Sequence, residues 1–302
     1  METMNKKVLQ LLKRNRVVIS DGAWGTLLQE RGLEPGVCPE SWNLTNPDKV
    51  MEVASAYVAA GSDMIETNSF GANRFKLEHY GLANKVYDIN RKAAEISRTA
   101  AGGAVLVLGS LGPTGKILMM GEVTEDEIYE AYKEQVIALE AGGADAICIE
   151  TMTALDEAIL AIKAAKENTD LEVLCTMTFD KTVTGEFRTM MGVSPEQMVA
   201  ELKAAGADIL GTNCGNGMEN MIPIVESIRA MDPDIPILVH ANAGLPHLQD
   251  GKNIFDETPE VTASYVSDLI LAGANLIGGC CGTTPQHIKA IKQKTSQLQH
   301  PS

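Results

Sequence analysis

A short apolar segment followed by a segment with helical spacing recurs eight times along this sequence. The apolar segments, which we interpret as strands, cover residues 17–20, 64–65, 105–108, 146–149, 173–178, 209–210, 236–240 and 274–277. The expected helices cover residues 47–60, 86–100, 124–139, 153–166, 194–206, 221–231 and 259–271, with a short helix at 9–16 and another from 284. Alternating strands and helices predict an α/β protein with a parallel sheet and right-handed crossovers. Eight such units within about 250 residues match the size of a (β/α)8 TIM barrel, which is the fold we expect.

A four-residue motif that recurs along the chain, which we call the echo, supports the count of eight units. Small residues around a glycine, followed by an aspartate or asparagine, recur at 60–63, 142–145, 205–208 and 272–275. Glycine suits the left-handed C-cap of a helix, so each echo predicts a helix end and a tight turn into a strand. The echoes precede the second, fourth, sixth and eighth expected strands. An open doubly wound sheet is the alternative, but it would usually divide so long a chain, so we expect one domain over 1–302 with a core at about 8–295.

The composition excludes several classes of protein. Of the 302 residues, 45% are apolar but only 4% are aromatic, so the core must consist mainly of aliphatic side chains. The formal net charge of −15 argues against sequence-independent binding to the phosphate backbone of nucleic acids. No apolar run approaches the ~20 residues of a membrane span, and the N-terminus lacks the pattern of a signal peptide. We therefore expect a cytoplasmic protein with reduced thiols and without nucleic-acid or membrane partners.

The most distinctive motif is the pair Cys280-Cys281, which lies between glycines after the last expected strand. Small buried residues are one interpretation, because free cysteine packs well in a core. A disulfide between neighbours is a second, but it prefers Cα atoms about 5.5–6 Å apart, and adjacent Cα atoms are about 3.8 Å apart. The third is a metal site, for which Cys214, in a glycine-rich turn after another expected strand, supplies a further ligand.

In a (β/α)8 barrel the carboxyl-terminal ends of the strands converge on the rim where active sites lie. These ends carry Asp21, Glu66, Thr67, Asn68, Ser110, Glu150, Thr178, Asn213, Cys214, His240, Asn242, Cys280 and Cys281. The convergence of three cysteines favours the metal site. We expect Cys148 and Cys175 in the core, Cys38 to be incidental, and His240 to be a polar rim residue without a catalytic role.

Three thiolates suit Zn²⁺, which prefers tetrahedral coordination and sulfur ligands. No fourth cysteine accompanies either motif, so we expect the fourth position to take an exchangeable ligand, as in catalytic sites. Zn²⁺ with three thiolates carries a net charge of −1. Such a site activates water poorly, but it binds a soft thiol and keeps it as a thiolate. The pattern therefore predicts thiol activation and alkyl transfer onto sulfur rather than hydrolysis.

Taken together, the motifs at 21–26, 66–70, 109–113, 213–214, 241–244 and 278–282 resemble the homocysteine S-methyltransferase family. The resemblance covers about residues 8 to 295 and is greatest to the homocysteine-binding domain of cobalamin-dependent methionine synthases. The double cysteine with its upstream Asn213-Cys214 is highly specific, whereas each other motif is weak alone. Trp24 departs from the family pattern, where we expect a smaller or more flexible side chain.

The resemblance implies a (β/α)8 barrel, homocysteine as the methyl acceptor that becomes methionine, and a catalytic zinc ion held by Cys214, Cys280 and Cys281. It also implies that acidic side chains on the rim bind the amino group of the acceptor. Asp21 and Glu150 are the first candidates for that role, and Glu66 and Asn68 are weaker ones.

The sequence leaves the methyl donor open. A chain of this length has no room for a pterin or corrinoid domain, so the donor is methylcobalamin on a separate protein or domain, which the resemblance favours, or S-methylmethionine or betaine. The chain is also compatible with one module of a longer enzyme. Two functions of other classes remain: a phosphate-binding barrel enzyme that uses the last glycine loop and the following helix N-terminus, and a non-catalytic thiol- or metal-binding subunit. The phosphate-binding alternative leaves the three rim cysteines without a role.

Overall fold

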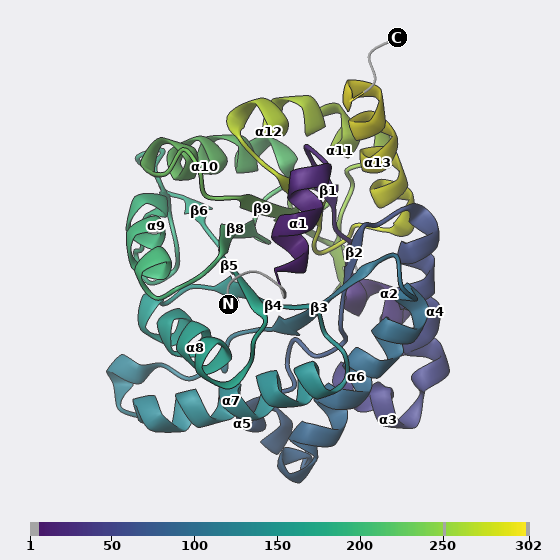
Figure 1. Cartoon of the computed structure of the whole chain (residues 1–302), viewed down its shortest axis with the longest axis vertical. Helices are drawn as coiled ribbons and strands as arrows, with labels where there is room; N and C mark the ends of the chain where they lie inside the picture. The colour runs from purple at the N-terminus through teal and green to yellow at the C-terminus, as the bar shows by residue number, and fades with distance from the viewer. Residues whose placement is uncertain (1–5, 250–251, 300–302) are drawn as a thin grey trace.

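Eight parallel strands curve into a barrel in the computed structural model of the chain, which describes residues 6–249 and 252–299 (Figure 1). They are β1 (Val18–Ile19), β2 (Met64–Glu66), β3 (Leu106–Leu111), β4 (Ala146–Met152), β5 (Glu172–Met177), β8 (Ile209–Asn213), β9 (Ile237–Ala241) and β12 (Leu276–Gly279). The order β1-β12-β9-β8-β5-β4-β3-β2 places successive barrel strands side by side, with the seam of the barrel between β1 and β2. The predicted (β/α)8 barrel is confirmed. The ends of the expected domain, residues 1–5 and 300–302, lie outside the described residues.

A ring of helices surrounds these strands (Figure 1). Its members are α4 (Pro47–Ala60), α6 (Val86–Ala101), α7 (Glu125–Ala141), α8 (Leu155–Asn168), α9 (Pro195–Ala204), α10 (Met218–Met231), α11 (Pro259–Ser264), α12 (Val266–Ala272) and α13 (Pro285–Gln299). Two of the expected helices begin with capping boxes, which Thr124 forms at the start of α7 and Ser194 at the start of α9. The single helix predicted at 259–271 is wrong, because the N–H of Tyr265 bonds the carbonyl of Thr262, three residues back, and divides the segment into α11 and α12.

The sequence did not predict several short elements. Most of them lie in the loops that follow the strands: α2 (Trp24–Glu30), η1 (Pro39–Ser41), α3 (Trp42–Thr45), α5 (Arg74–Glu78), η2 (Ala83–Lys85), η3 (Leu118–Met120), and the hairpins β6 (Asp180–Lys181) with β7 (Phe187–Arg188) and β10 (His247–Gln249) with β11 (Lys252–Ile254). Elements this short contain too few residues to show a hydrophobic period. Of these, α2 and η1, which follow β1, contribute to the wall at the carboxyl-terminal end of the barrel.

The opposite end of the barrel is closed by α1 (Lys7–Arg14), which lies across it in Figure 1. Val8 is fully buried and packs in one apolar cluster with side chains from the interior of the barrel. The carboxylate of Glu172 accepts hydrogen bonds from the backbone N–H groups of Val8 (2.6 Å) and Leu9 (3.0 Å), which satisfies the first turn of α1. Among the helices that the structure describes, none has both the length and the apolar character needed to cross a membrane.

The four echoes form the same contact, which we call a clasp, at the amino-terminal end of the barrel. Gly61, Gly143, Gly206 and Gly273 all have φ between 97° and 117°, as expected for left-handed helix caps. The last side chain of each echo accepts a backbone N–H from the preceding barrel strand: Asp63 from Ile19 (2.9 Å), Asp145 from Val107 (2.8 Å), Asp208 from Val173 (2.9 Å) and Asn275 from Ile237 (3.0 Å). Each clasp therefore fastens a strand to the turn that begins the next one.

Removal of the Asp208 clasp should destabilise the protein. Its carboxylate is largely buried, binds the N–H of Val173 and pairs with Lys166 and Lys6. We expect Asp208→Ala to lower the free energy of unfolding at neutral pH by about 2–3 kcal/mol, because a buried N–H loses its partner and the ion pairs are lost. Urea unfolding measures this difference, and Asp208→Asn, which keeps an acceptor for Val173, should recover part of it.

The difference in the free energy of unfolding between wild type and Asp208→Ala should depend on pH, because the carboxylate of Asp208 titrates. Burial raises the pKa of Asp208, but the hydrogen bonds from Lys166 and Val173 outweigh burial and leave it below its ordinary value of 3.8. A lowered carboxyl pKa contributes stability above the unfolded pKa and loses it as pH falls through the folded pKa. The difference in the free energy of unfolding between wild type and Asp208→Ala should therefore become smaller below about pH 4. Equal stabilities at pH 7 would contradict the role of the clasp.

Candidate functional site

A pocket of about 250 Å³ opens among the carboxyl-terminal ends of the strands. Its walls come from the last residues of β2, β3, β4 and β12 and from the segments that follow β1, β2, β8 and β12. They consist of Gly22, Ala23, Trp24, Gly25, Thr26, Pro39, Glu40, Glu66, Thr67, Asn68, Ser69, Phe70, Ser110, Glu150, Thr151, Cys214, Gly279, Cys280 and Cys281. Six of the seven site residues predicted from the sequence line this one pocket. The seventh, Asp21, is fully buried and contacts two of the lining residues.

The three rim cysteines lie together although more than 60 residues of sequence separate Cys214 from the other two. Their Sγ atoms lie within 4.8 Å of one another, and those of Cys214 and Cys281 are 4.0 Å apart. All three thiols are free and partly exposed, unlike Cys148 and Cys175, which are buried in the core as predicted. Neither simple core packing nor a disulfide between neighbours describes such a group, which presents three sulfur atoms to the pocket.

The spacing and chemistry of these sulfurs fit a tetrahedral metal ion. Sulfur atoms at about 2.3 Å from a tetrahedral zinc ion would be about 3.8 Å apart, close to the observed separation. Hydrogen bonds from the thiols of Cys280 and Cys281 lower the pKa of Cys214 to about 3, and the same contacts raise the pKa of the two donors. The contacts among the three thiols favour the thiolate form at Cys214, and a soft cation would replace the protons that the thiols share.

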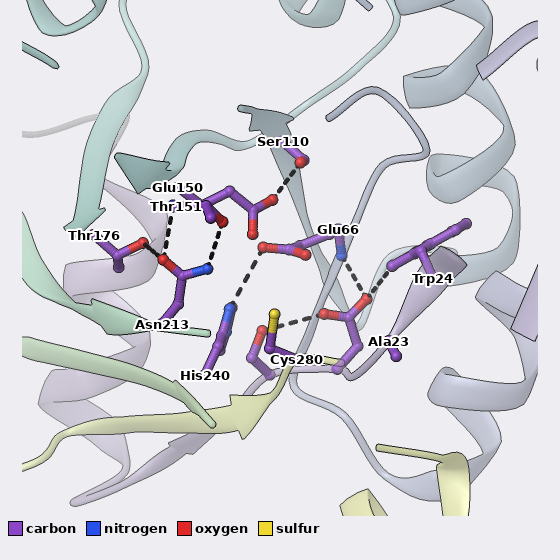
Figure 2. Close-up of polar contacts among 12 residues, drawn as sticks. Ala23, Trp24, Glu66, Ser110, Glu150, Thr151, Thr176, Asn213, His240 and Cys280 are labelled. Carbon is purple, nitrogen blue, oxygen red and sulfur yellow. Dashed lines mark hydrogen bonds and ion pairs between the residues drawn. The ribbon is translucent and has the colours of Figure 1, made fainter. Parts of the chain in front are cut away.

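Glu66, Glu150 and His240 form a second group whose ligand atoms lie within 4.8 Å of one another. Figure 2 shows the carboxylates of Glu66 and Glu150 turned towards each other, with the ring of His240 beside Glu66. His240 Nδ1 is 3.6 Å from Glu66 Oε1, and neither that oxygen nor His240 Nε2 has a hydrogen-bond partner among the described residues. His240 is 1% exposed, so it lies inside the barrel rather than on the open rim, and burial lowers its pKa to about 4, which keeps the imidazole neutral.

The buried carboxyl groups at the pocket have raised pKa values. Burial raises the pKa of Asp21 to about 6 and that of Glu150 to about 7, although each accepts hydrogen bonds that oppose the shift. Burial, and then the charges of Glu150 and Asp21, raises the pKa of Glu66 well above its ordinary value. No lysine or arginine is among the described residues that line the pocket. Lys76, outside the lining, is a cation whose charge acts on Glu150. A positively charged group on a ligand would therefore meet Glu66 and Glu150 in the pocket wall, with Asp21 buried behind them.

Asp21 fastens the seam of the barrel as well as belonging to this acidic group. Its Oδ2 accepts hydrogen bonds from the backbone N–H of Glu66 and from Nε1 of Trp24, both at 2.8 Å (Figure 2 shows both donors). The first bond joins the end of β1 to β2, between which no strand pairing forms in the described sheet. The second gives a specific partner to Trp24, which we expect from the sequence to depart from the family pattern and which forms part of the pocket wall.

Asn68 and Glu40 form a wall of the pocket in different ways. Asn68 lines the pocket, but its amide donates hydrogen bonds to the carbonyl of Pro39 (2.9 Å) and to Asn43 Oδ1 (3.0 Å), which hold the loop 39–43 in place. Sequence reasoning missed Glu40, which is 6% exposed and accepts the N–H of Gly71 at 2.6 Å. Cys38 Sγ lies 3.2 Å from Glu40 Oε2, so Cys38 is a packed partner of this wall rather than an incidental residue. No local pattern marks Glu40, because it lies in η1, a 3-10 helix of three residues that is too short to show a hydrophobic period.

The chain resembles a known protein family over most of its length. The sequence profile described as homocysteine S-methyltransferase matches residues 18–295. The chain belongs to the homocysteine S-methyltransferase family. It is 32% identical over 309 residues to a methionine synthase of Mycobacterium tuberculosis, with 95% of this chain covered, and 33% identical over 301 residues to a methionine synthase of Mycobacterium leprae, with 91% covered. It spans only about a quarter of the length of these relatives (25% and 24%).

A solved structure resembles the chain over nearly its whole length. The metallated form of the homocysteine methyltransferase MmuM from Escherichia coli is 25% identical, with a TM-score of 0.79. The match covers 94% of this chain and 98% of that protein. The barrel therefore belongs to a family with a metallated member, and two groups of its own side chains bring potential metal ligands together.

Proposed function

We propose that the chain is a zinc-dependent S-methyltransferase that transfers a methyl group onto the thiol of homocysteine to give methionine. We also propose that residues of about 8–295 form one homocysteine-binding domain. The observation that carries the proposal is the presence, in one pocket, of three sulfur ligands and a separate group of buried carboxylates. Homocysteine has a thiol at one end and an ammonium group at the other, so the two groups suit its two ends.

We assign the metal to Cys214, Cys280 and Cys281 and the ammonium group to the carboxylates. The three sulfurs match the soft ligands that zinc favours, and they leave one coordination position for a ligand from the pocket. When bound, Zn²⁺ lowers the pKa of a thiol ligand, so that the sulfur of the acceptor is held as a nucleophilic thiolate at neutral pH. Glu66, Glu150 and His240 also suit a metal, but His240 is absent from the pocket lining, and the two carboxylates face the space that an amino acid would occupy.

The other residues of the pocket position and enclose the acceptor. Glu150, held by Ser110 Oγ, and Asp21, held by Trp24 and the N–H of Glu66, offer negative charge to the ammonium group. Glu66 is close enough to both carboxylates for their negative charges to raise its own pKa. Trp24 and Phe70 supply apolar surface along the wall. Binding the acceptor at both ends holds its sulfur in one place for in-line attack on a methyl group.

Two sources of the methyl group remain under this proposal. Methylcobalamin on a separate corrinoid protein or domain is supported by the relatives called methionine synthase, of which this chain matches only about a quarter. A small donor such as S-methylmethionine or betaine is supported by the match over 98% of the MmuM chain, which is described as a homocysteine methyltransferase. We favour the corrinoid because the sequence is more similar to the methionine synthases.

The alternatives outside methyl transfer have less support. A phosphate-binding enzyme needs positive charge or free backbone N–H groups, and the pocket instead presents three carboxyl groups. A non-catalytic thiol-binding subunit would need the sulfur ligands but would not need the buried acidic group.

The decisive experiment is an assay of the zinc-loaded protein with homocysteine and a panel of donors. We expect methionine to form with at least one of methylcobalamin, a methylated corrinoid protein, S-methylmethionine and betaine. The donor that works decides between the two sources. Binding of homocysteine without turnover by any donor would favour the non-catalytic subunit, and the absence of homocysteine binding would contradict the proposed function itself.

A further inference from the structure

Two residues adjoining the two halves of the site have an uncommon backbone conformation. Thr151 has φ 62° and Cys214 has φ 58°, and among the described residues no other non-glycine residue has positive φ. This left-handed region is unfavourable for a side chain with a Cβ, and most of all for a β-branched one such as threonine. Thr151 directly follows Glu150, and Cys214 is one of the three sulfur ligands. Both conformations must therefore be held by contacts in the surrounding structure.

One buried side chain lies between them. Asn213 is fully buried and immediately precedes Cys214. Its Oδ1 accepts hydrogen bonds from the backbone N–H of Thr151 and from Thr176 Oγ1, and its Nδ2 donates to Thr151 Oγ1; all three distances are 2.7 Å. Figure 2 shows the amide of Asn213 between the two threonines, with Glu150 beside Thr151. We call these three hydrogen bonds the amide clamp.

The amide clamp replaces a bond that the sheet does not supply. The pairing of β4 with β5 is regular up to Ile149 and resumes at Met152, with a shift in register between them. Such a bulge takes a backbone N–H out of the ladder and turns side chains to new directions. The Oδ1 of Asn213 accepts the N–H of Thr151, so it takes the part of a main-chain carbonyl. It does so from β8, which is separated from β4 by β5.

We propose that Asn213 is a positioning residue that fixes the carboxylate of Glu150 relative to the sulfur of Cys214. The clamp joins the residue after Glu150 to the residue before Cys214, so a displacement of either would strain the same three hydrogen bonds. An acceptor held at both ends needs a constant distance between these two anchors, because its reacting sulfur must stay in line with the donor. The inference rests on the proposed function, since it takes the acceptor to be an amino thiol.

The test compares two acceptors that differ only in the amino group. Homocysteine uses both anchors, whereas 4-mercaptobutyrate has the thiol and the carboxyl group but nothing for Glu150 to bind. We expect Asn213→Ala to raise KM for homocysteine by about 10- to 100-fold, as a misplaced anchor should. The kcat/KM for 4-mercaptobutyrate and the zinc content should stay near those of the wild type. Thr212→Val is the matched control, because Thr212 lies on the same strand but directs its hydroxyl to Met221. It should leave KM for both acceptors unchanged.

A second substitution tests the physical cause. Glycine adopts positive φ without steric penalty, so it should keep the bulge in place without the clamp. In the double variant Asn213→Ala with Thr151→Gly we therefore expect most of the loss in KM for homocysteine to be restored. If Asn213→Ala does not fold, Thr151→Val removes only the Nδ2 bond and should raise KM for homocysteine alone, to a smaller extent.

Three results would overturn the inference: loss of zinc in the clamp variant, equal losses with both acceptors, or no recovery on adding the glycine. An inactive wild type with every donor is a different result, since it appears before any variant is made and contradicts the proposed function.

Discussion

Replacement of Cys281 by alanine should remove bound zinc and methyl transfer together. Its Sγ lies 4.0 Å from that of Cys214 and belongs to the group of three that faces the pocket. Two sulfurs alone leave the ion with too few protein ligands, so we expect less than about a tenth of the wild-type zinc content after dialysis, since even loss of an outer-shell partner typically weakens binding 10- to 100-fold. Cys280→Ala should behave in the same way. Metal analysis and the methionine-forming assay, run on one preparation, measure both effects.

Cys175→Ala is the matched control for this loss. Cys175 is fully buried in the core and lies outside the pocket lining, so its removal leaves a small cavity but takes no ligand. We expect it to lower stability by about 1 kcal/mol while zinc content and turnover stay near normal. Near-normal turnover in a metal-free Cys281→Ala preparation would refute the zinc-dependent mechanism.

Replacement of Glu150 by glutamine should weaken homocysteine binding and stabilise the free protein at the same time. Glutamine keeps an oxygen for the hydrogen bond from Ser110 but loses the charge that would face the ammonium group. We expect KM for homocysteine to rise by about 30-fold or more, which corresponds to the ~2 kcal/mol or more lost when one partner of a buried charge pair is removed. With 4-mercaptobutyrate the same variant should show little change, and an equal effect on both acceptors would contradict the assignment.

The pKa of Glu150 determines how both effects depend on pH. Burial raises it to about 7, so in the free protein the carboxyl group becomes charged only as pH passes neutrality. Homocysteine affinity of the wild type should therefore improve between pH 6 and 8. Glu150→Gln should lose the part of that dependence that Glu150 contributes and keep the part that Asp21, Glu66 and the acceptor thiol contribute. A raised carboxyl pKa gives stability that is fully present below the unfolded pKa and is lost as pH rises through the folded pKa. At pH 8 we expect the variant to be more stable than wild type by about 2–3 kcal/mol in urea unfolding.

The features that could be predicted from the sequence are those encoded locally. The echo glycines mark helix caps by conformation, and the capping boxes of Thr124 and Ser194 mark helix starts by hydrogen bonding within three residues. The meeting of Cys214 with Cys280 and Cys281 followed from the topology, because every strand of a (β/α)8 barrel ends at the same rim.

The features that could not be predicted depend on contacts across the fold. The amide clamp joins Asn213 to Thr151 and Thr176, which are 62 and 37 positions away in the sequence. No local sequence pattern around Glu150 predicts the bulge that the clamp holds. Glu40 reaches the pocket because Asn68 holds its segment against the wall and because Glu40 itself accepts the N–H of Gly71. The interior position of His240 depends on the depth at which β9 ends, and a sequence pattern fixes element boundaries to within only a few residues.

The four clasps lie at the amino-terminal end of the barrel, whereas the pocket opens at the other. Loops at the mouth can therefore lengthen, shorten or change composition without loosening the fastening that keeps the strands in order. Under the proposed function, this separation would let the source of the methyl group change through the loops at the mouth alone. For protein engineers, the same separation makes this barrel a scaffold whose upper loops are open to transplantation.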